Sequence, residues 1–180
     1  MGPNGYRLAL HGTLPGLLPL LAFEGATQRT KPQLKVGDAV YCRVAAAPGD
    51  MEPTLSCAAS STSAGSRKGW ETGEATFGPL AAGGTVLRAA SLESARSLRR
   101  HDHPVVAALE EERVAFELAA GDNGVVWVRA ATPPLTIAVA NAVQNGLALA
   151  AMPGGSEKVA RATIAAMVKD IIGRVRKQPD

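Results

Sequence analysis

The chain has 180 residues, of which 46% are hydrophobic and only 4% aromatic, and its formal net charge is +3. This length is enough for one or two small domains with a hydrophobic core. The mild positive charge permits a polyanionic partner without requiring one, and few aromatic side chains are present to stack against bases.

Two cysteines, Cys42 and Cys57, are too few for a disulfide framework, and each lies in a strand-like context. We predict that both are reduced, small apolar side chains, as is typical of an intracellular protein. The apolar run 14–23 contains two prolines and a glycine, and no cationic segment precedes it. It predicts neither a signal peptide nor a membrane span, which needs about 20 residues.

The first third of the chain has the pattern of short β-strands. Residues 5–11 alternate apolar and polar side chains, whereas 17–23 is a more buried run that contains Pro19. Further strands are predicted at 39–45 and 54–58, with turn-forming residues between them. Short strands at this regular spacing are typical of a small barrel or sandwich.

A connector rich in Gly, Ser and Thr, residues 60–84, precedes a segment with a different pattern. Ser91 and Thr132 are predicted helix N-caps, and Pro104 and Pro133 suit the first turn of a helix. The predicted order is strand, helix, helix, strand, strand, helix. These elements are expected at 85–89, 91–100, 104–111, 113–119 and 125–130, with the last helix starting at 133.

A final helix is predicted from Ser156 to about Arg176, after a Pro-Gly-Gly break. Its apolar stripe must dock on a surface of this chain or of a partner. The stripe comprises Ala160, Ile164, Met167, Ile171 and Val175, and the outward-facing cations are Lys158, Arg161, Lys169 and Arg174.

The tetrapeptide Gly-Asp-Asn-Gly at 121–124 has two interpretations. A Gly-x-x-Gly loop holds a nucleic-acid backbone in the RNA-binding module called KH. The same letters also suit a tight turn between two strands, because Asn-Gly accepts a positive φ.

The element order after residue 85 resembles a eukaryotic-type (type I) KH domain, and the strands before it resemble an S1 domain, an OB-type barrel. Several motifs sharpen this resemblance, which runs from about residue 4 to 144, to the S1/KH cap subunits of the RNA exosome. They are AFEGAT at 22–27, KP at 31–32, VGD at 36–38, DMEP at 50–53, GDNG at 121–124 and VWV at 126–128.

The resemblance implies an α+β chain with a truncated S1 barrel, a type I KH domain and a C-terminal helix. The corresponding domains are 1–62, 63–150 (with the connector) and 151–180. The family's S1 domain has a strand before the one predicted at 5–11. We therefore expect the barrel to lack its first strand and to expose an unpaired edge.

KH domains that grip RNA carry their Gly-x-x-Gly between the first two helices. The corresponding residues here, 99–104, include no glycine, and the tetrapeptide instead joins two predicted strands. We therefore predict a structural role for Gly121, Asn123 and Gly124, and a KH fold without its usual RNA grip. In the family, too, this motif is packed where S1 meets KH.

Four cations are candidate RNA contacts. Arg99 and Arg100 either touch RNA phosphate or lie on a bare surface loop. Arg67 and Lys68 lie near Trp70, which either stacks on a base or belongs to a core or interface.

We predict no catalytic constellation, metal or cofactor. The carboxylates of Glu110, Glu111 and Glu112 form a run at a helix end, whereas two-metal nucleases need spaced acids that converge on a cleft. His101 and His103 lack further ligands and are expected in a solvated loop.

The resemblance implies a non-catalytic cap subunit that bridges RNase-PH-like ring subunits and other cap subunits and guides single-stranded RNA. It further implies work in rRNA processing and RNA turnover in the nucleus, nucleolus and cytoplasm, with no membrane and no small-molecule substrate. Two alternatives remain: a free-standing S1/KH RNA-binding protein in translation or mRNA regulation, and a nuclease that uses the carboxylate run.

Overall fold

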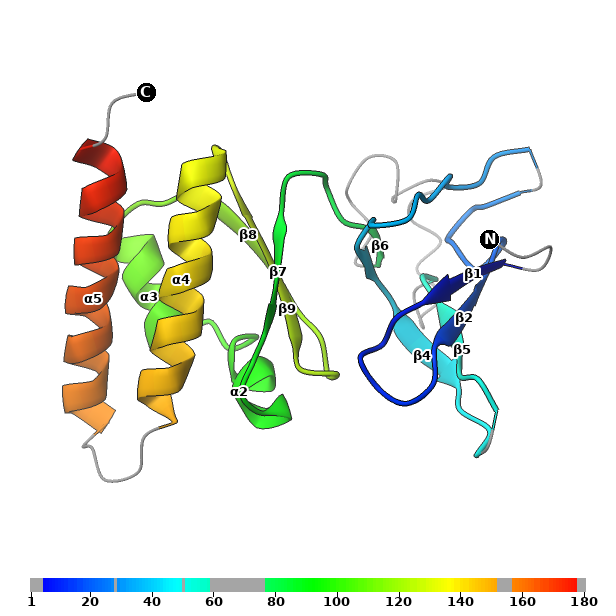
Figure 1. Cartoon of the computed structure of the whole chain (residues 1–180), viewed down its shortest axis with the longest axis horizontal. Coiled ribbons are helices and arrows are strands. Elements are labelled where there is room, and N and C mark those ends of the chain that lie inside the picture. Colours follow the sequence, from blue (N-terminus) through cyan, green and yellow to red (C-terminus); the bar gives the residue numbers. More distant parts are fainter. Residues whose placement is uncertain (1–4, 28, 50, 59–76, 152–156, 178–180) are drawn as a thin grey trace. The chain divides into compact units, whose positions relative to one another are not determined.

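The structure is a computed structural model that describes residues 5–27, 29–49, 51–58, 77–151 and 157–177. The chain divides into two compact units, Met1–Ala82 and Gly83–Asp180, whose described residues run from blue to green and from green to red in Figure 1. The described elements of the first unit are all strands, and the second combines strands and helices. The predicted α+β class is therefore confirmed. The domain boundary predicted near residue 62 lies outside the described residues.

The described residues of the first unit form one four-stranded sheet and one two-stranded pair. The larger sheet has the order β1-β2-β5-β4, in which β2 and β5 are parallel and the other pairs antiparallel. Among the described strands, β1 pairs with β2 alone and lies at the sheet edge. The strands are β1 (Gly5–Leu8), β2 (Gly16–Pro19), β3 (Val40–Tyr41), β4 (Arg43–Ala46), β5 (Thr54–Ser56) and β6 (Gly78–Pro79), with β3 and β6 antiparallel.

Among the described residues of this unit, few side chains make up the core. Leu18 and Leu55 are almost completely buried, together with Phe23 and Cys57. The Tyr6 hydroxyl donates a hydrogen bond to the Pro32 carbonyl at 2.7 Å, which ties the loop after β2 to β1. Burial raises the pKa of the Cys57 thiol to about 12. Both cysteines are free, in accordance with the prediction.

The second unit has one antiparallel sheet with the order β7-β9-β8. Its element order agrees with the predicted strand, helix, helix, strand, strand, helix, followed by a final helix. None of the described helices is long and apolar enough to cross a bilayer. The elements are β7 (Thr85–Arg88), α2 (Leu92–Ser97), α3 (Pro104–Glu111), β8 (Phe116–Ala120), β9 (Val125–Ala130), α4 (Pro133–Ala150) and α5 (Glu157–Lys177).

Side-chain caps fix the starts of the first three helices. The Ser91 hydroxyl accepts from the Ser94 amide at 3.0 Å at the start of α2. The Thr132 hydroxyl accepts from the Leu135 amide at 3.4 Å, and prolines occupy the first turns of α3 and α4. These contacts satisfy amide groups that have no partner within the helix.

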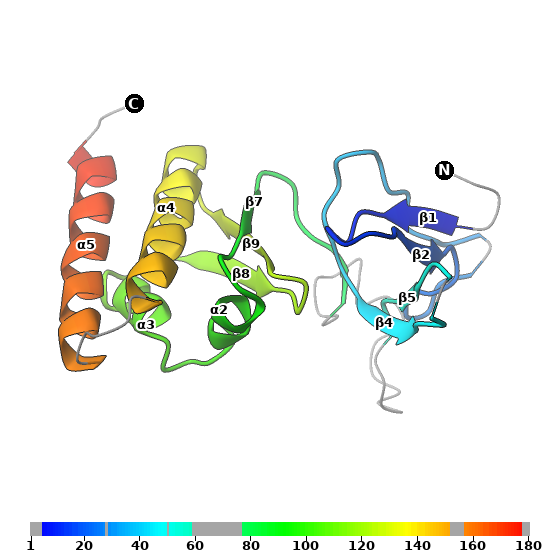
Figure 2. The same cartoon turned by 60° about the horizontal axis from the view of Figure 1, so that its bottom comes forward.

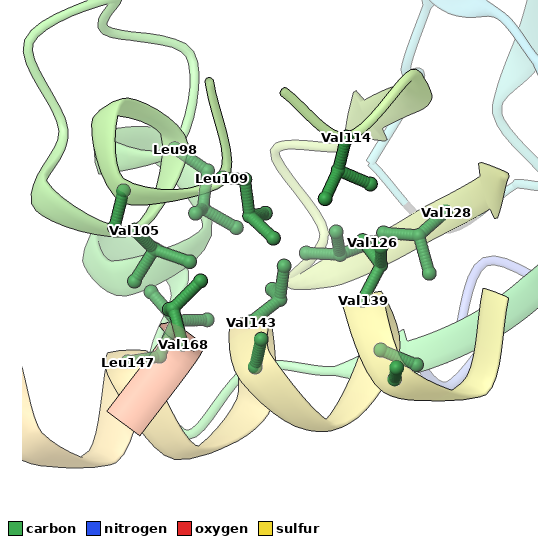
Figure 3. Close-up of a cluster of buried hydrophobic side chains, with 14 of the residues drawn as sticks. Leu98, Val105, Leu109, Val114, Val126, Val128, Val139, Val143, Leu147 and Val168 are labelled. Atoms are coloured by element: carbon green, nitrogen blue, oxygen red, sulfur yellow. The ribbon is translucent and has the colours of Figure 1, made fainter. Parts of the chain in front are cut away.

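The core of the second unit lies between the sheet and the helices. Val126 and Val128 alternate on β9 and point from the sheet toward Val139 and Val143 of α4 (Figure 3). Both views place α5 beyond α3 and α4, on the side away from the sheet (Figures 1 and 2). This second unit therefore has three layers: the sheet, the pair α3–α4, and α5.

Several elements differ from their predicted extents. The strand predicted to begin at Arg113 begins at Phe116, because Arg113 has a φ of 53° that no strand accepts. The strand predicted over 17–23 ends at Pro19, whose carbonyl accepts from the Ala22 amide in a turn. In α2, Ala95 is fully buried, whereas Leu92 at the start of the helix is 51% exposed.

The buried stripe of α5 is also rotated from its predicted position. Ile164, Val168 and Ile172 are fully buried, at a spacing of four residues. Ile171, placed in the predicted stripe, is only half-buried. Val168 and Ile172, each one position after a residue of the predicted stripe, are the buried side chains. Their burial reflects the packing of α5 against both α3 and α4.

Candidate nucleic-acid interface

The tetrapeptide at 121–124 forms a compact turn between β8 and β9. The Gly121 amide donates to the Val125 carbonyl at 2.8 Å, and the Gly124 amide donates to the Gly121 carbonyl at 3.3 Å. The Asn123 side-chain oxygen accepts from the Val125 amide at 3.2 Å. Each of these bonds is internal to the turn, so the backbone amides of Gly121, Gly124 and Val125 are already satisfied.

Local geometry explains why both Gly121 and Gly124 are glycines. Gly124 has a φ of 78°, and a Cβ there would lie 3.2 Å from the Leu92 side chain. A Cβ at Gly121 would clash with the Asn123 side-chain oxygen. Turn geometry and close packing thus account for Gly121, Asn123 and Gly124 without a ligand.

The remaining turn residue, Asp122, binds two arginines of the α2 region. Its carboxylate lies 2.9 Å from Arg96 Nε and 2.7 Å from Arg99 Nη2. Hydrogen bonds from Arg99 and then Arg96 hold the pKa of the Asp122 carboxyl below its ordinary value. These ion pairs therefore hold the turn against the α2 region. They could not be predicted from the sequence, since 26 residues separate Arg96 from Asp122.

The other candidate arginine, Arg100, lies in the connection between α2 and α3. It binds Asp102 through two contacts, Nε–Oδ1 at 3.0 Å and Nη2–Oδ2 at 2.8 Å. The hydrogen bond from Arg100 lowers the pKa of the Asp102 carboxyl. The structure thus brings Arg99 and Arg100 near one another but pairs each with a carboxylate, both at exposed positions.

His103 serves as the N-cap of α3. Its Nδ1 accepts from the Val105 amide at 3.3 Å, and the side chain is only 6% exposed. The predicted solvated position is therefore wrong for His103, although His101 is exposed. Burial lowers the pKa of the His103 imidazole, which favours the neutral form that accepts this bond.

The remaining candidate site residues either lie outside the described residues or belong to the acidic run at the end of α3. Arg67, Lys68 and Trp70 lie outside the described residues. At the end of α3, the Glu112 carbonyl accepts from Arg176 Nη2 at 2.6 Å, and its carboxylate lies 3.6 Å from Arg176 Nη1. Within the described part of the chain, no three His, Cys, Asp or Glu side chains gather in a way that could hold a metal ion.

Comparison with known proteins identifies the first unit. The family model described as "Exosome complex component RRP40, S1 domain" matches residues 2–69. This match confirms an S1 domain in the first unit, over the residues that contain β1 to β5.

Full-length relatives extend the similarity into the second unit. Exosome complex component RRP40 of Drosophila melanogaster is 36% identical over 138 residues, which cover 77% of this chain and 54% of the relative. The Schizosaccharomyces pombe protein of that name is 33% identical, with 79% and 55% covered, and the human protein 30% identical, with 77% and 46% covered. The chain spans about half the length of these curated relatives.

One solved structure has the same overall fold. A crystal structure described as an exosome complex RNA-binding protein superimposes with a TM-score of 0.64 and covers 98% of this chain and 90% of its own. Its sequence identity is 13%, so this likeness concerns the fold alone. The resemblance seen in the sequence motifs is confirmed, and the chain is a relative of exosome complex component RRP40 over most of its length.

Proposed function

We propose that this chain is a non-catalytic, RNA-binding cap subunit of the RNA exosome, which supports 3′-to-5′ RNA processing and degradation. The observation that carries this proposal is the S1 match over residues 2–69, together with RRP40 relatives that align with more than three quarters of the chain. S1 domains are OB-type barrels, a fold that binds single-stranded nucleic acid in a groove.

The second unit is, in this proposal, a type I KH domain that does not grip RNA through a glycine loop. Its strand, helix, helix, strand, strand, helix order supports the KH assignment. The connection between α2 and α3 has no glycine, and its cation Arg100 is bound to Asp102. The turn at 121–124 joins two strands and uses its amides internally.

The proposed partners are RNase-PH-like ring subunits, the other cap subunits and single-stranded RNA. Exposed apolar side chains of the first unit, such as Met51 and Val36, support contact with protein partners, which would cover them. We place this work, including rRNA processing, in the nucleus, nucleolus and cytoplasm, without a membrane or a small-molecule substrate.

A catalytic role is not proposed. Within the run of carboxylates at the end of α3, Arg176 contacts Glu112 twice. It donates a hydrogen bond to the Glu112 carbonyl and forms an ion pair with the Glu112 carboxylate. A nuclease of the two-metal kind needs carboxylates that converge on a pair of metal ions. Cleavage of RNA by the purified chain, lost on replacement of Glu110–Glu112 by glutamine, would contradict this part of the proposal.

The test is purification of the tagged chain from native extract, followed by mass spectrometry of the proteins bound at physiological salt. The proposal expects the ring subunits and the other cap proteins in near-equal amounts. Recovery of the chain alone, or with ribosomes or RNA only, would contradict it and favour a free-standing RNA-binding protein.

A further inference from the structure

The two cysteines of the first unit lie opposite one another on neighbouring strands. β4 and β5 pair antiparallel, with Arg43 opposite Ser56, and they lie side by side in both views (Figures 1 and 2). One further step of the same register places Cys42 opposite Cys57. The register shift of this strand pair falls after Val44, on the other side of Arg43, so it does not disturb that step.

Hydrogen bonding of the backbone fixes the type of this pair. The Cys57 amide donates to the Ala22 carbonyl at 2.8 Å, beside the bridge that links Cys57 to Phe23. The amide and carbonyl of one strand residue point to the same side, so Cys57 turns neither group toward Cys42. Opposed residues of this non-hydrogen-bonded kind have Cα atoms about 4.5 Å apart. A disulfide needs a Cα separation of about 4.4–6.8 Å, and this spacing lies within that range.

The two thiol side chains belong to the same core. Cys57 is 2% exposed, and the half-buried Cys42 packs against the cluster that contains it. The Cys57 Sγ lies 3.7 Å from the carbonyl oxygen of Tyr41, the residue directly before Cys42. Burial raises the pKa of both thiols, and the nearby Cys42 raises the pKa of Cys57 further. The two sulfur atoms are therefore neighbours on one face of the strand pair.

Thiol–disulfide exchange is the chemistry that this arrangement allows. Within the described residues, no third His, Cys, Asp or Glu joins the pair to complete a metal site. We propose that Cys42 and Cys57 form a reversible intramolecular disulfide when the chain meets a small-molecule disulfide such as oxidised glutathione. This inference goes beyond the proposed function and does not depend on it.

Cys42 is the thiol that reacts first, because it is the more exposed of the two. Its sulfur loses a proton and attacks one sulfur of oxidised glutathione, whose S–S bond breaks, and one glutathione leaves with the proton. The Cys57 sulfur then attacks the Cys42 sulfur, and the second glutathione leaves with the Cys57 proton. Two protein thiols have lost two electrons in total, and one small disulfide has been reduced to two thiols.

The position of Cys42 gives the bond a structural consequence. Cys42 lies between β3 and β4, and β4 pairs with β5 alone among the described strands. The raised pKa values make exchange slow in the closed sheet, because the thiolate is the nucleophile. Opening of the edge strand β4 exposes the pair, and the disulfide then ties β4 to β5. Oxidation should therefore restrict local opening of this edge of the S1 unit.

The test incubates the folded full-length chain with oxidised glutathione at about pH 8, near the ordinary thiol pKa. Iodoacetamide blocks the remaining thiols before mass spectrometry. Arg43 separates the two cysteines, so trypsin places Cys42 in the peptide 36–43 and Cys57 in the peptide 44–67. The expected product is this pair of peptides joined by a disulfide, with a loss of about 2 Da from the intact chain. Dithiothreitol should reverse the change.

The matched control is Cys42→Ala, which keeps the almost fully buried Cys57 in place. It should give no linked peptides and at most a mixed disulfide of Cys57 with glutathione. A second measurement needs no substitution. Amide hydrogen exchange in β4 and β5 of the oxidised chain should slow by about threefold or more, and it should recover after reduction.

Mixed disulfides or linked dimers without the intramolecular product would overturn the inference, and so would no reaction at all. Linked peptides that form only in urea would show that the folded strands do not support the bond, which also contradicts it. Unchanged exchange in β4 and β5 of the linked product would rule out the restraint on the sheet edge. The proposed function is tested separately, because the extract experiment is carried out on the reduced chain.

Discussion

The two units differ in how much of their apolar surface they bury themselves. Among the described residues, eighteen buried side chains share the core of the second unit, against five in the first. Conversely, the first unit exposes more large apolar side chains. Those of the first unit are Leu14, Leu21, Val36, Val44 and Met51, and those of the second are Val86, Leu92, Ile137 and Val159.

This difference indicates where each unit obtains its stability. A small core supports only a marginal fold, because hydrophobic burial offsets the entropy of ordering the chain by a narrow margin. The second unit adds a helical layer, α5, that closes its core with Ile164, Val168 and Ile172. We infer that the second unit is self-supporting, whereas the S1 unit would gain stability from the partner subunits proposed above.

The largest expected effect comes from equal deletions in the two cores. Leu109→Ala and Leu55→Ala each remove a side chain that is at most 1% exposed, at an expected cost of about 2–5 kcal/mol. Each should lower the stability of its own unit. In a Trp70→Phe background, fluorescence of Trp127 reports unfolding of the second unit in urea. Leu109→Ala should shift this transition and Leu55→Ala should leave it in place, whereas a shared shift would mean that the units unfold together.

A smaller effect is expected in the turn at 121–124. Gly124→Ala forces a Cβ into a φ of 78° next to Leu92, so we expect a loss of about 1–2 kcal/mol in the second unit. Gly173→Ala is the matched control, because it lies in α5 with nothing near its Cβ and should stabilise by about 0.4–1 kcal/mol. Urea unfolding measures both. A Gly124→Ala variant that keeps its stability but loses RNA affinity would show that the turn binds RNA.

The pH dependence of the second unit should depend on His103. Its folded pKa lies below the unfolded value of 6.5, so neutral His103 contributes stability that is complete above about pH 6.5. As pH falls through that value toward the folded pKa, the unfolded state binds more protons and this contribution is lost. His103→Asn should keep the cap and flatten the stability profile between pH 7.5 and 5.5, whereas His103→Ala should cost about 1 kcal/mol at neutral pH. An unchanged profile in His103→Asn would rule out this role.

The smallest effect is expected for the clamp between α2 and the turn. Asp122→Asn removes the negative charge that pairs with Arg96 and Arg99, but these groups are exposed, so the expected cost is about 0.2–1 kcal/mol. The difference from the unmodified chain should shrink in high salt. A double-mutant cycle with Arg96→Gln measures the pair directly, and a coupling that does not depend on salt would contradict an exposed ion pair.

Local chemistry in the sequence predicts much of the fold. Ser91, Pro104 and Thr132 mark helix starts that the cap contacts confirm, because capping depends on residues within one turn. The strand ends were less predictable. The side chain of Arg113 is compatible with a strand, but its backbone is left-handed, with a φ of 53°. This conformation arises in the connection between α3 and β8 and has no signal in the neighbouring sequence.

Contacts between distant residues could not be read from the sequence. The apolar stripe of α5 predicted burial but gave no sign that α3 and α4 supply the surface. Likewise, Asp122 and Arg96 become partners only when the β8–β9 turn folds against α2. The RNA contacts of Arg99 and Arg100 stay predictions, as does the structural role of the turn, and Arg67 and Lys68 lie beyond the described residues.

The most direct test of the account is cross-linking mass spectrometry of the assembly purified with the tagged chain, using a lysine-reactive reagent. Lys31 and Lys35 report on the S1 unit, and Lys169 and Lys177 report on α5. The account predicts cross-links from Lys31 or Lys35 to RNase-PH-like subunits and none from α5 to the ring. Cross-links to the ring from α5 alone, or an assembly without ring subunits, would contradict it.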